Sequence, residues 1–328
     1  MKIVSLFSGA GGLDLGFHKA GFQTIWANEF DKAIWETFEH NFPQTFLDKR
    51  SITKVLSADV PACAGIIGGP PCQSWSEAGA GRGIEDSRGK LFFEYIRILK
   101  AKEPLFFLAE NVSGILLPKH KQAFQSILAQ FQALNYNVSY HLLNANNFGV
   151  PQDRQRVIIV GYHKKLGKTF SPPEEILPRP TLKDAIFDLR LAKPAKDKNY
   201  TNGNEALSAS NHEYMNGGFS TIYMSRNRVR AWEEPSFTIQ AGGRHAPLHP
   251  QAPKMQFVEQ NKRIFALGSE DLYRRLSVRE CARVQTFPDN FLFKYQNIAD
   301  GYKMIGNAVP VEFAKHLANK IYEDIFSG

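Results

Sequence analysis

The alternation of apolar and amphipathic segments over the first 165 residues is the feature that most constrains the fold of this 328-residue chain. Short apolar runs typical of strands are each joined to stretches with helical apolar spacing, the order of a parallel sheet covered by helices. Strands are expected at 3–7, 23–28, 64–68, 104–109, 136–143 and 156–162, and helices near 13–20, 31–41, 90–101 and 119–134. The pattern predicts an α/β fold with a doubly wound, mostly parallel sheet, which binds ligands at the carboxyl ends of its strands.

A change of pattern after residue 165 predicts a second domain. A proline-rich segment at 171–180 reads as a boundary, and 206–270 has no helical period. Ser277 and Glu280 have the spacing of a capping box that opens a helix, and 310–326 is again amphipathic. We expect a first domain of residues 1–175, completed by 303–328, and a smaller, irregular domain with its hinge at 176–302.

Composition narrows the class of protein. No run of about 18 apolar residues and no signal peptide appear, so we expect a soluble, cytoplasmic protein without a membrane segment. Three cysteines without CxxC spacing argue against a disulfide framework and a zinc site. The net charge of +8 favours a polyanionic partner, and residues 220–285 hold eleven Lys and Arg against six Asp and Glu.

The loop after the first strand has the composition of a cofactor site. Phe-Ser-Gly-Ala-Gly-Gly at 7–12 lacks the third glycine of a dinucleotide fingerprint, because Asp14 stands there, and a plain strand-to-helix turn remains an alternative. Glu29, at the end of the second strand, could accept both hydroxyls of a ribose, and Phe30 could stack on an adenine. These features suit an adenosine cofactor without a diphosphate, such as S-adenosylmethionine.

Cys72 is the candidate nucleophile. It lies in Gly-Gly-Pro-Pro-Cys-Gln-Ser-Trp-Ser at 68–76, directly after an expected strand. Free cysteines are usually small buried hydrophobes, but the sequence that follows is too polar and glycine-rich to bury. Glu110, in Glu-Asn-Val at 110–112, could act as its acid or base partner, unless it is merely an exposed acid at a strand end.

Two arginines form a second candidate group. Arg154 and Arg156 lie in Gln-Asp-Arg-Gln-Arg at 152–156, and on a strand two residues apart point to one face. Such a pair could grip a base carbonyl or a phosphate. The alternative is solvated charge.

Eight motifs, in their order along the chain, resemble those of the DNA cytosine-5 methyltransferases, and the resemblance covers essentially the whole sequence. They are Phe-Ser-Gly-Ala-Gly-Gly at 7–12, Asn-Glu at 28–29, the cysteine motif at 68–76, Arg-Gly-Lys-Leu-Phe at 88–92, Glu-Asn-Val at 110–112, Gln-Asp-Arg-Gln-Arg at 152–156, Arg-Glu-Cys-Ala-Arg-Val-Gln-Thr-Phe-Pro-Asp at 279–289 and Gly-Asn-Ala-Val-Pro at 306–310.

The resemblance implies a mechanism without a metal. The family flips the target cytosine out of the duplex. The Cys72 thiolate then attacks ring carbon 6, Glu110 protonates or hydrogen-bonds ring nitrogen 3, and Arg156 holds the 2-oxo group. Carbon 5 takes the methyl group of S-adenosylmethionine, which leaves S-adenosylhomocysteine, and Cys72 is eliminated.

The resemblance also implies a set of cofactor residues, namely Phe7, Gly9, Ala10, Gly11, Glu29, Phe30, Ser51, Ile52, Pro71, Leu91, Asn307 and Ala308. Because Asn307 comes from the far end of the sequence, the C-terminal helix should pack on the first domain. Ser51 departs from the family, in which many members have an aspartate that accepts the adenine amino group; Asp48 is nearby but out of register.

The basic segment is expected to read the DNA target. Arg226, Arg228, Arg230 and Arg244 are its candidate DNA-binding residues. Arginine is the commonest bidentate reader of guanine, although some of these residues could hold phosphates instead. With 248–253 and 272–276, these segments resemble the subgroup that methylates the inner cytosine of GGCC. A monomer that acts on duplex DNA beside a cognate restriction endonuclease is the implied arrangement.

Two other functions remain open from the sequence. A related branch of the family methylates transfer RNA, although the arginine-rich segment favours duplex DNA. Ser51 also leaves room for a DNA-binding protein with an inactive catalytic site.

Overall fold

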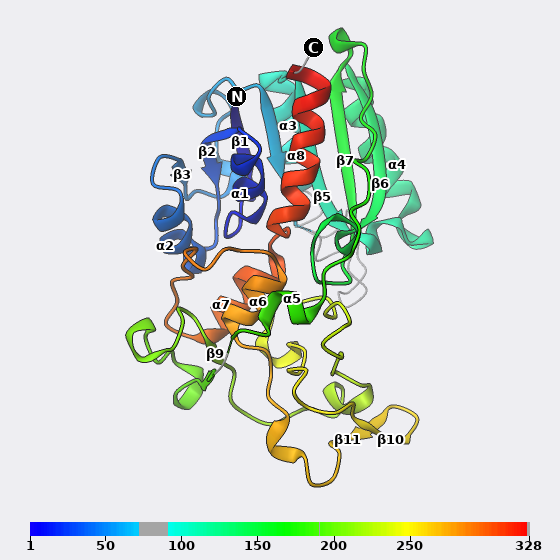
Figure 1. Ribbon diagram of the computed structural model, residues 1–328. Helices are drawn as coiled ribbons and strands as arrows, with labels where there is room; N and C mark the ends of the chain where they lie inside the picture. The colour runs from blue at the N-terminus through cyan, green and yellow to red at the C-terminus, as the bar shows by residue number, and fades with distance from the viewer. Residues whose placement is uncertain (72–90, 190, 327–328) are drawn as a thin grey trace. The chain divides into compact units, whose positions relative to one another are not determined.

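The chain forms two compact units in the computed structural model, which describes residues 1–71, 91–189 and 191–326 (Figure 1). The first comprises Met1–Asn144, Gln155–Glu175 and Val311–Gly328, and the second Ala145–Arg154 and Ile176–Pro310. Unlike the expected boundaries, 145–154 and 303–310 belong to the second unit. The first of these segments bridges Ser236 through Gln152, and the second completes a helix that begins at Ile298. No helix in the described ranges is long and apolar enough to cross a membrane.

The first unit is built on a seven-stranded sheet in the order β3-β2-β1-β4-β5-β7-β6. Neighbours pair in parallel except for β7, which runs antiparallel to both β5 and β6. The mostly parallel α/β sheet expected from the sequence is therefore confirmed. Its strands are β1 (Lys2–Leu6), β2 (Gln23–Asn28), β3 (Phe46–Asp48), β4 (Gly65–Gly68), β5 (Phe106–Val112), β6 (Tyr136–Asn144) and β7 (Gln155–His163).

Helices cover both faces of this sheet. They are α1 (Gly12–Lys19), α2 (Lys32–Asn41), α3 (Leu91–Lys102), α4 (Lys121–Ala133) and the C-terminal α8 (Val311–Phe326). α1 and α8 lie side by side on one face (Figure 1). Their contact is close because a Cβ atom on Gly16 would come within 2.4 Å of the Ala314 side chain. As expected, the C-terminal helix packs on the first unit.

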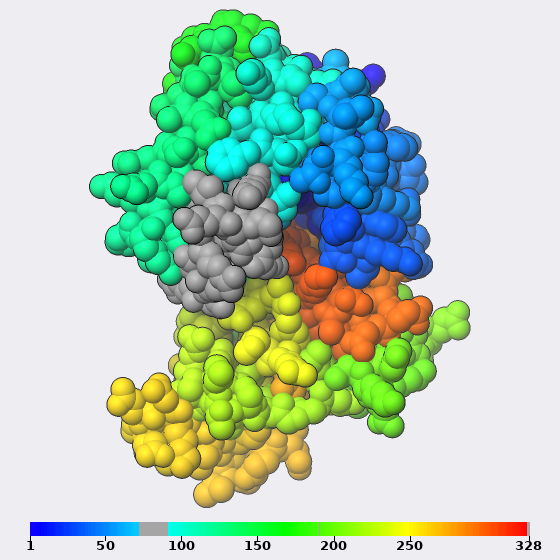
Figure 2. Space-filling model, turned by 180° about the vertical axis from the view of Figure 1, so that it is seen from behind, coloured from blue at the N-terminus to red at the C-terminus, as the bar shows by residue number. Residues whose placement is uncertain are grey.

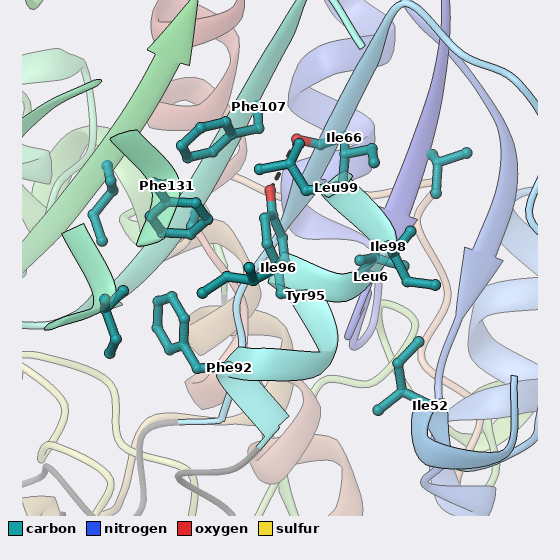
Figure 3. Close-up of a cluster of buried hydrophobic side chains, with 14 of the residues drawn as sticks. Leu6, Ile52, Ile66, Phe92, Tyr95, Ile96, Ile98, Leu99, Phe107 and Phe131 are labelled. Atoms are coloured by element: carbon teal, nitrogen blue, oxygen red, sulfur yellow. Dashed lines mark hydrogen bonds between the residues drawn. The ribbon is translucent and has the colours of Figure 1, made fainter. Parts of the chain in front are cut away.

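Alternation along β5 divides the apolar core between the two faces, since successive strand residues point in opposite directions. Phe106 packs on Phe17 of α1, with ring centroids 6.3 Å apart. Phe107 points the other way and stacks on Phe131 of α4 at 4.4 Å. On that second face the Tyr95 hydroxyl, from α3, donates to the carbonyl oxygens of Ile66 and Leu108, each at 3.0 Å. Figure 3 shows this cluster between α3 and the sheet.

Asp14 of α1 is a fully buried carboxyl group in the first unit. Its Oδ1 accepts a hydrogen bond from the Thr24 hydroxyl at 3.1 Å, and burial raises its pKa to about 6. As the pH rises, the unfolded state, with an ordinary carboxyl pKa of 3.8, therefore releases this proton at a lower pH than the folded state does. The stabilisation by this protonated form is complete below about pH 4 and is lost as the pH rises through 6.

We expect Asp14→Asn to flatten this dependence. Because the neutral amide cannot ionise, the free energy of unfolding of the variant relative to wild type should rise by about 1.4 kcal/mol from pH 5 to pH 8. Urea unfolding at the two pH values measures this change. Glu36→Gln, which removes an exposed acid from the same unit, is the control. An equal pH response in wild type and Asp14→Asn would contradict the assignment.

The second unit has short helices and strands joined by long irregular segments. Its helices and strands are α5 (Leu182–Ile186), β8 (Lys193–Pro194), β9 (Glu213–Tyr214), β10 (Gln256–Glu259), β11 (Lys262–Ile264), α6 (Val278–Val284) and α7 (Ile298–Asn307). The predicted capping box is confirmed, since the Ser277 and Glu280 side chains exchange hydrogen bonds with each other's main-chain N–H at the start of α6. Buried Arg279 donates to the carbonyls of Ser210, Pro288 and Phe291. Side-chain bonds to the main chain thus replace a large sheet in stabilising this unit.

Candidate active site

A carboxylate–guanidinium pair lies at the carboxyl edge of the first unit's sheet. Glu110 is on β5 and Arg156 on the antiparallel β7, where they are diagonal neighbours on one face. Arg156 Nε lies 2.8 Å from Glu110 Oε1, and each side chain is 12% exposed. Strand β5 continues through Glu110 to Val112, which corrects the expected end at residue 109. The carboxylate is therefore held in a fixed position rather than free at a strand terminus.

The segment that leads to the cysteine passes directly beside this carboxylate. A Cβ atom on Gly69 would lie 3.2 Å from Glu110 Oε2, so the main chain approaches the carboxylate closely. One residue further on, the Asn111 side-chain amide donates to the Pro70 carbonyl at 3.3 Å. Cys72 itself lies outside the described residues, and its role as nucleophile remains a prediction. The preceding residues nevertheless bring the chain to the Glu110–Arg156 pair.

Arg154 does not join Arg156, which corrects the predicted arginine pair. Its side chain is 1% exposed and belongs to the second unit. The guanidinium donates to the carbonyl oxygens of Ile239, Gly306 and Ala308, at 3.0, 2.8 and 3.0 Å. The rule that residues two apart share a face holds only within a strand, and β7 begins at Gln155. Arg154 therefore stabilises the main chain of the second unit and is not part of the fork expected from the sequence.

The loop after β1 and the end of β2 form the candidate cofactor site. Glu29 Oε2 accepts the main-chain N–H of Gly9 at 2.9 Å, and its Oε1 accepts that of Asp31 at 2.7 Å. Phe7 has a φ of 54°, a conformation that a bulky residue rarely adopts and that occurs mainly at functional sites. Gly11 is required sterically, since a Cβ atom there would lie 2.2 Å from the Phe42 ring.

Free space and an exposed ring complete this arrangement. Among the residues that the structure describes, none lies within 4 Å of the position that a Cβ atom on Gly9 would take, and Phe30 is 69% exposed. A fixed Glu29 carboxylate and an exposed aromatic ring suit the hydroxyls and the base of an adenosine. These residues therefore fit the cofactor class that the sequence predicts.

The other predicted cofactor residues differ from one another in their exposure. Ala10, Ile52 and Ala308 are buried, whereas Pro71 and Leu91 are half-buried. The Ser51 hydroxyl lies 2.9 Å from that of Thr53, and Asn307 is exposed at the end of α7.

Asp48 does not replace the missing aspartate at position 51. Both its carboxylate oxygens accept hydrogen bonds from Arg50. Although burial alone would raise the pKa of Asp48, these bonds hold it below its ordinary value. The carboxylate is thus already committed to a cation within the protein.

The predicted DNA-binding arginines differ in their surroundings. Arg226 and Arg244 are exposed, and the segments that carry them lie at the surface of the second unit, yellow-green to yellow in Figure 2. Arg228 is 7% exposed and donates to the carbonyls of Tyr223 and Ile222. Arg230 is engaged with Asp153, at 3.0 Å. Arg226 and Arg244 are therefore the two best placed to meet a partner.

A cavity of about 220 Å³ lies beside these arginines within the second unit. Its polar lining comes from Arg226, Asn227, Arg228, Thr238, Gln240 and His245. Partial removal from water, followed by the charge of neighbouring arginines, holds the pKa of His245 below its ordinary value; these arginines are Arg228, Arg226, Arg244 and Arg275. The positive side chains therefore converge on one small region.

The sequence did not identify Thr238 and His245 of this cavity, nor the buried amides that support it. Gln152 Nε2 donates to Gln285 Oε1 at 2.9 Å, and Gln152 Oε1 accepts the N–H of Ile239 at 2.8 Å. Both glutamines belong to motifs of the sequence, Gln152 to the motif at 152–156 and Gln285 to the motif at 279–289. Nothing in the local sequence indicated that they would bond to each other.

Solved structures share this fold. The chain superposes on a prophage-encoded protein of E. coli with a TM-score of 0.75 and 23% identity, over 100% of both chains. It superposes on the methyltransferase EhMeth of Entamoeba histolytica with a TM-score of 0.69 and 16% identity, over 99% of this chain and 98% of that one. At such identities these likenesses establish the fold, which is that of a methyltransferase.

The sequence identifies the family. The model of the C-5 cytosine-specific DNA methylases matches residues 1–323, so the chain belongs to that family and is a DNA (cytosine-5-)-methyltransferase. It is 55% identical over 329 residues to the Type II methyltransferase M.FnuDI of Fusobacterium nucleatum, across 99% of this chain and 95% of that protein. It is also 55% identical over 325 residues to M.MthTI of Methanothermobacter thermautotrophicus, across 99% and 98%. The family resemblance inferred from the motifs is thereby confirmed.

Proposed function

We propose that this enzyme transfers the methyl group of S-adenosylmethionine to carbon 5 of the inner cytosine of GGCC in duplex DNA, through a covalent bond to Cys72. The observation that carries the proposal is the Glu110–Arg156 pair, 2.8 Å apart, beside the segment that leads into Cys72. An acid and a cation held together at the approach to a thiol are the groups that activation of a cytosine ring needs.

In the proposed reaction the target cytosine leaves the duplex and enters the site. The Cys72 thiolate forms a bond to carbon 6 and the carbon 5–carbon 6 π bond opens, while Glu110, in its protonated form, donates a proton or hydrogen bond to nitrogen 3 and so stabilises the electron density that the attack pushes into the ring. Arg156 orients Glu110 and can donate to the 2-oxo group. Carbon 5, now nucleophilic, takes the methyl group. The carbon 5 proton then passes to solvent water, the carbon 6–sulfur bond breaks with its electron pair leaving on the Cys72 thiolate, and the proton at nitrogen 3 returns to Glu110, which restores the aromatic ring.

S-adenosylmethionine supplies the electrophilic methyl group when it is bound. Glu29 would bind its ribose hydroxyls and Phe30 would stack on its adenine, with the loop at Phe7 and Gly9 against the rest of the molecule. The fixed Glu29 carboxylate, the open space at Gly9 and the exposed Phe30 ring support this assignment. Asn307 and Ala308 of the second unit are included from the family motif.

For the target we propose that Arg226, Arg228 and Arg244 read guanines. Support comes from the exposure of Arg226 and Arg244, the shared cavity of Arg226 and Arg228, and the fit of guanidinium groups to the O6 and N7 acceptors of guanine. The Arg230–Asp153 ion pair favours a supporting role for Arg230 instead. Because the curated relatives are Type II methyltransferases, we further propose that the enzyme acts as a monomer that protects DNA from a cognate endonuclease.

Incubation of the enzyme with plasmid DNA and S-adenosylmethionine tests this function. We expect GGCC sites to become resistant to an endonuclease that cleaves them, while sites of other sequences stay sensitive. Methyl transfer to RNA but not to a GGCC duplex would favour the RNA-modifying branch of the fold. Specific binding to GGCC without any methyl transfer would indicate an inactive DNA-binding protein. Protection at a different sequence would contradict the proposed GGCC target but not the proposed reaction.

A further inference from the structure

Tyr223 lies fully buried beside the arginines of the second unit. The Arg228 guanidinium lies over its ring at 4.7 Å from the ring centroid, and the Arg275 guanidinium lies 5.5 Å from the same centroid. The tyrosine hydroxyl donates to the Ala246 carbonyl at 2.7 Å. One side chain therefore contacts the segment of Arg226 and Arg228 and also the segment of Arg244 and His245.

The Tyr223 ring lies close to the positive charges of Arg228 and Arg275, in addition to filling space in the core. Burial lowers the pKa of both Arg228 and Arg275, which reflects their removal from water. Neither forms an ion pair with a described acidic residue. The negative face of the aromatic ring and main-chain carbonyl oxygens are thus the groups that offset these two cations.

Hydrogen bonds hold each of the two cations beside Tyr223. Arg228 Nε donates to the Tyr223 carbonyl at 3.0 Å, which closes a short loop between the two residues. Arg275 donates to the carbonyls of Gly217 and Gly218, at 3.0 and 2.9 Å, and lies over Phe219 at 4.1 Å. Arg275 is therefore a structural cation, whereas Arg228 also lines the cavity that it shares with Arg226.

We propose that Tyr223 is a positioning residue for target recognition, whose ring and hydroxyl hold the segments of Arg226, Arg228 and Arg244 in the geometry that reads the DNA sequence. The inference rests on the proposed function, in which these arginines read guanines. Bidentate contacts with guanine require a fixed guanidinium plane, so a displaced arginine would still attract phosphates but would distinguish bases less well. Loss of Tyr223 should therefore lower sequence discrimination more than general affinity for DNA.

The test compares Tyr223→Leu with Tyr273→Leu. Tyr273 belongs to the same small apolar cluster and stacks on Phe265 at 4.2 Å, but neither Arg228 nor Arg275 lies over its ring. For each variant, kcat/KM is measured on a GGCC duplex and on duplexes with one altered guanine, and KM for GGCC is measured across a range of salt concentrations. In Tyr223→Leu we expect the discrimination ratio to fall about tenfold. KM for GGCC should rise, kcat should change less than about threefold, and the salt slope, which counts phosphate contacts, should stay constant.

Tyr223→Phe keeps the ring and removes only the bond to Ala246, so its discrimination should fall about threefold even if the leucine variant does not fold. Equal discrimination in Tyr223→Leu and Tyr273→Leu, or wild-type discrimination in Tyr223→Phe, would overturn the positioning role. A wild-type enzyme that does not distinguish the duplexes would instead overturn the proposed target. The two failures are therefore separable.

Discussion

Glu110→Gln is expected to reduce the turnover of the enzyme by about 10²–10⁴-fold, the usual contribution of a positioned acid or base. Glutamine has nearly the same shape as glutamate but cannot supply a proton to ring nitrogen 3. Attack by Cys72 would then build negative charge in the ring without a group to accept it. Single-turnover methylation of a GGCC duplex measures the chemical step directly. Because the base-reading residues are unchanged, the affinity for DNA should stay within a few fold.

Glu94→Gln is the matched control for this variant. Glu94 on α3 pairs with Arg97 at 2.8 Å, the same separation as in the Glu110–Arg156 pair, but within the described part of the chain it pairs with neither Glu110 nor Arg156. Its loss should leave turnover close to wild type. A Glu110→Gln enzyme with wild-type turnover would remove the carboxylate from the mechanism, and an equal loss in both variants would point to general damage.

Arg154→Met is expected to lower the free energy of unfolding by roughly 3–5 kcal/mol, since it leaves three buried carbonyl oxygens without their charged donor. One of these carbonyls belongs to Ile239, and the other two belong to Gly306 and Ala308, in a segment that is distant from Ile239 in the sequence. Lysine cannot replace the planar fork of donors, so Arg154→Lys should lose most of the same stability. Urea unfolding followed by circular dichroism gives the magnitude.

Arg156→Met, two residues along the chain, should behave differently, because it removes the partner of the proposed catalytic carboxylate. Arg156 contacts Glu110 and the adjacent Gln155 carbonyl, so its removal should cost most of the activity and, since the pair is largely buried, about 3 kcal/mol of stability as well. If Arg154→Met instead kept full stability and lost only turnover, the result would support the pair of catalytic arginines that the sequence predicted.

These two arginines show where sequence reasoning about the site succeeds and fails. The alternating pattern located the strands that end near Glu29 and Glu110 and the strand that begins near Arg156, because apolar periodicity is a local property of the chain. The parallel topology then placed Glu29 and Glu110 at one edge. The same reasoning placed Arg154 on a strand that begins one residue later, since the chain's departure from the sheet has no local signal.

Other differences between the predicted and the observed structure also arise where the local sequence carries no signal. Strand β3 has three residues, too few for a period to be visible. The extension of β5 to Val112 depends on pairing with β7, more than 40 residues away in the sequence. In the second unit the main chain is held by buried side chains such as Arg279, whose carbonyl partners span from Ser210 to Phe291. Such bonds follow no period, so composition predicted an irregular domain but not its geometry.

The family and the reaction class follow from the whole sequence, whereas the covalent step depends on one sulfur atom. A GGCC duplex in which 5-fluorocytosine replaces the target base tests that step most directly, because the fluorine at carbon 5 cannot leave as a proton does and the enzyme stays attached. In the presence of S-adenosylmethionine we expect a covalent protein–DNA complex whose adduct mass spectrometry locates on Cys72. An adduct on another residue, or no adduct under conditions in which the unmodified duplex is methylated, would contradict the proposed mechanism.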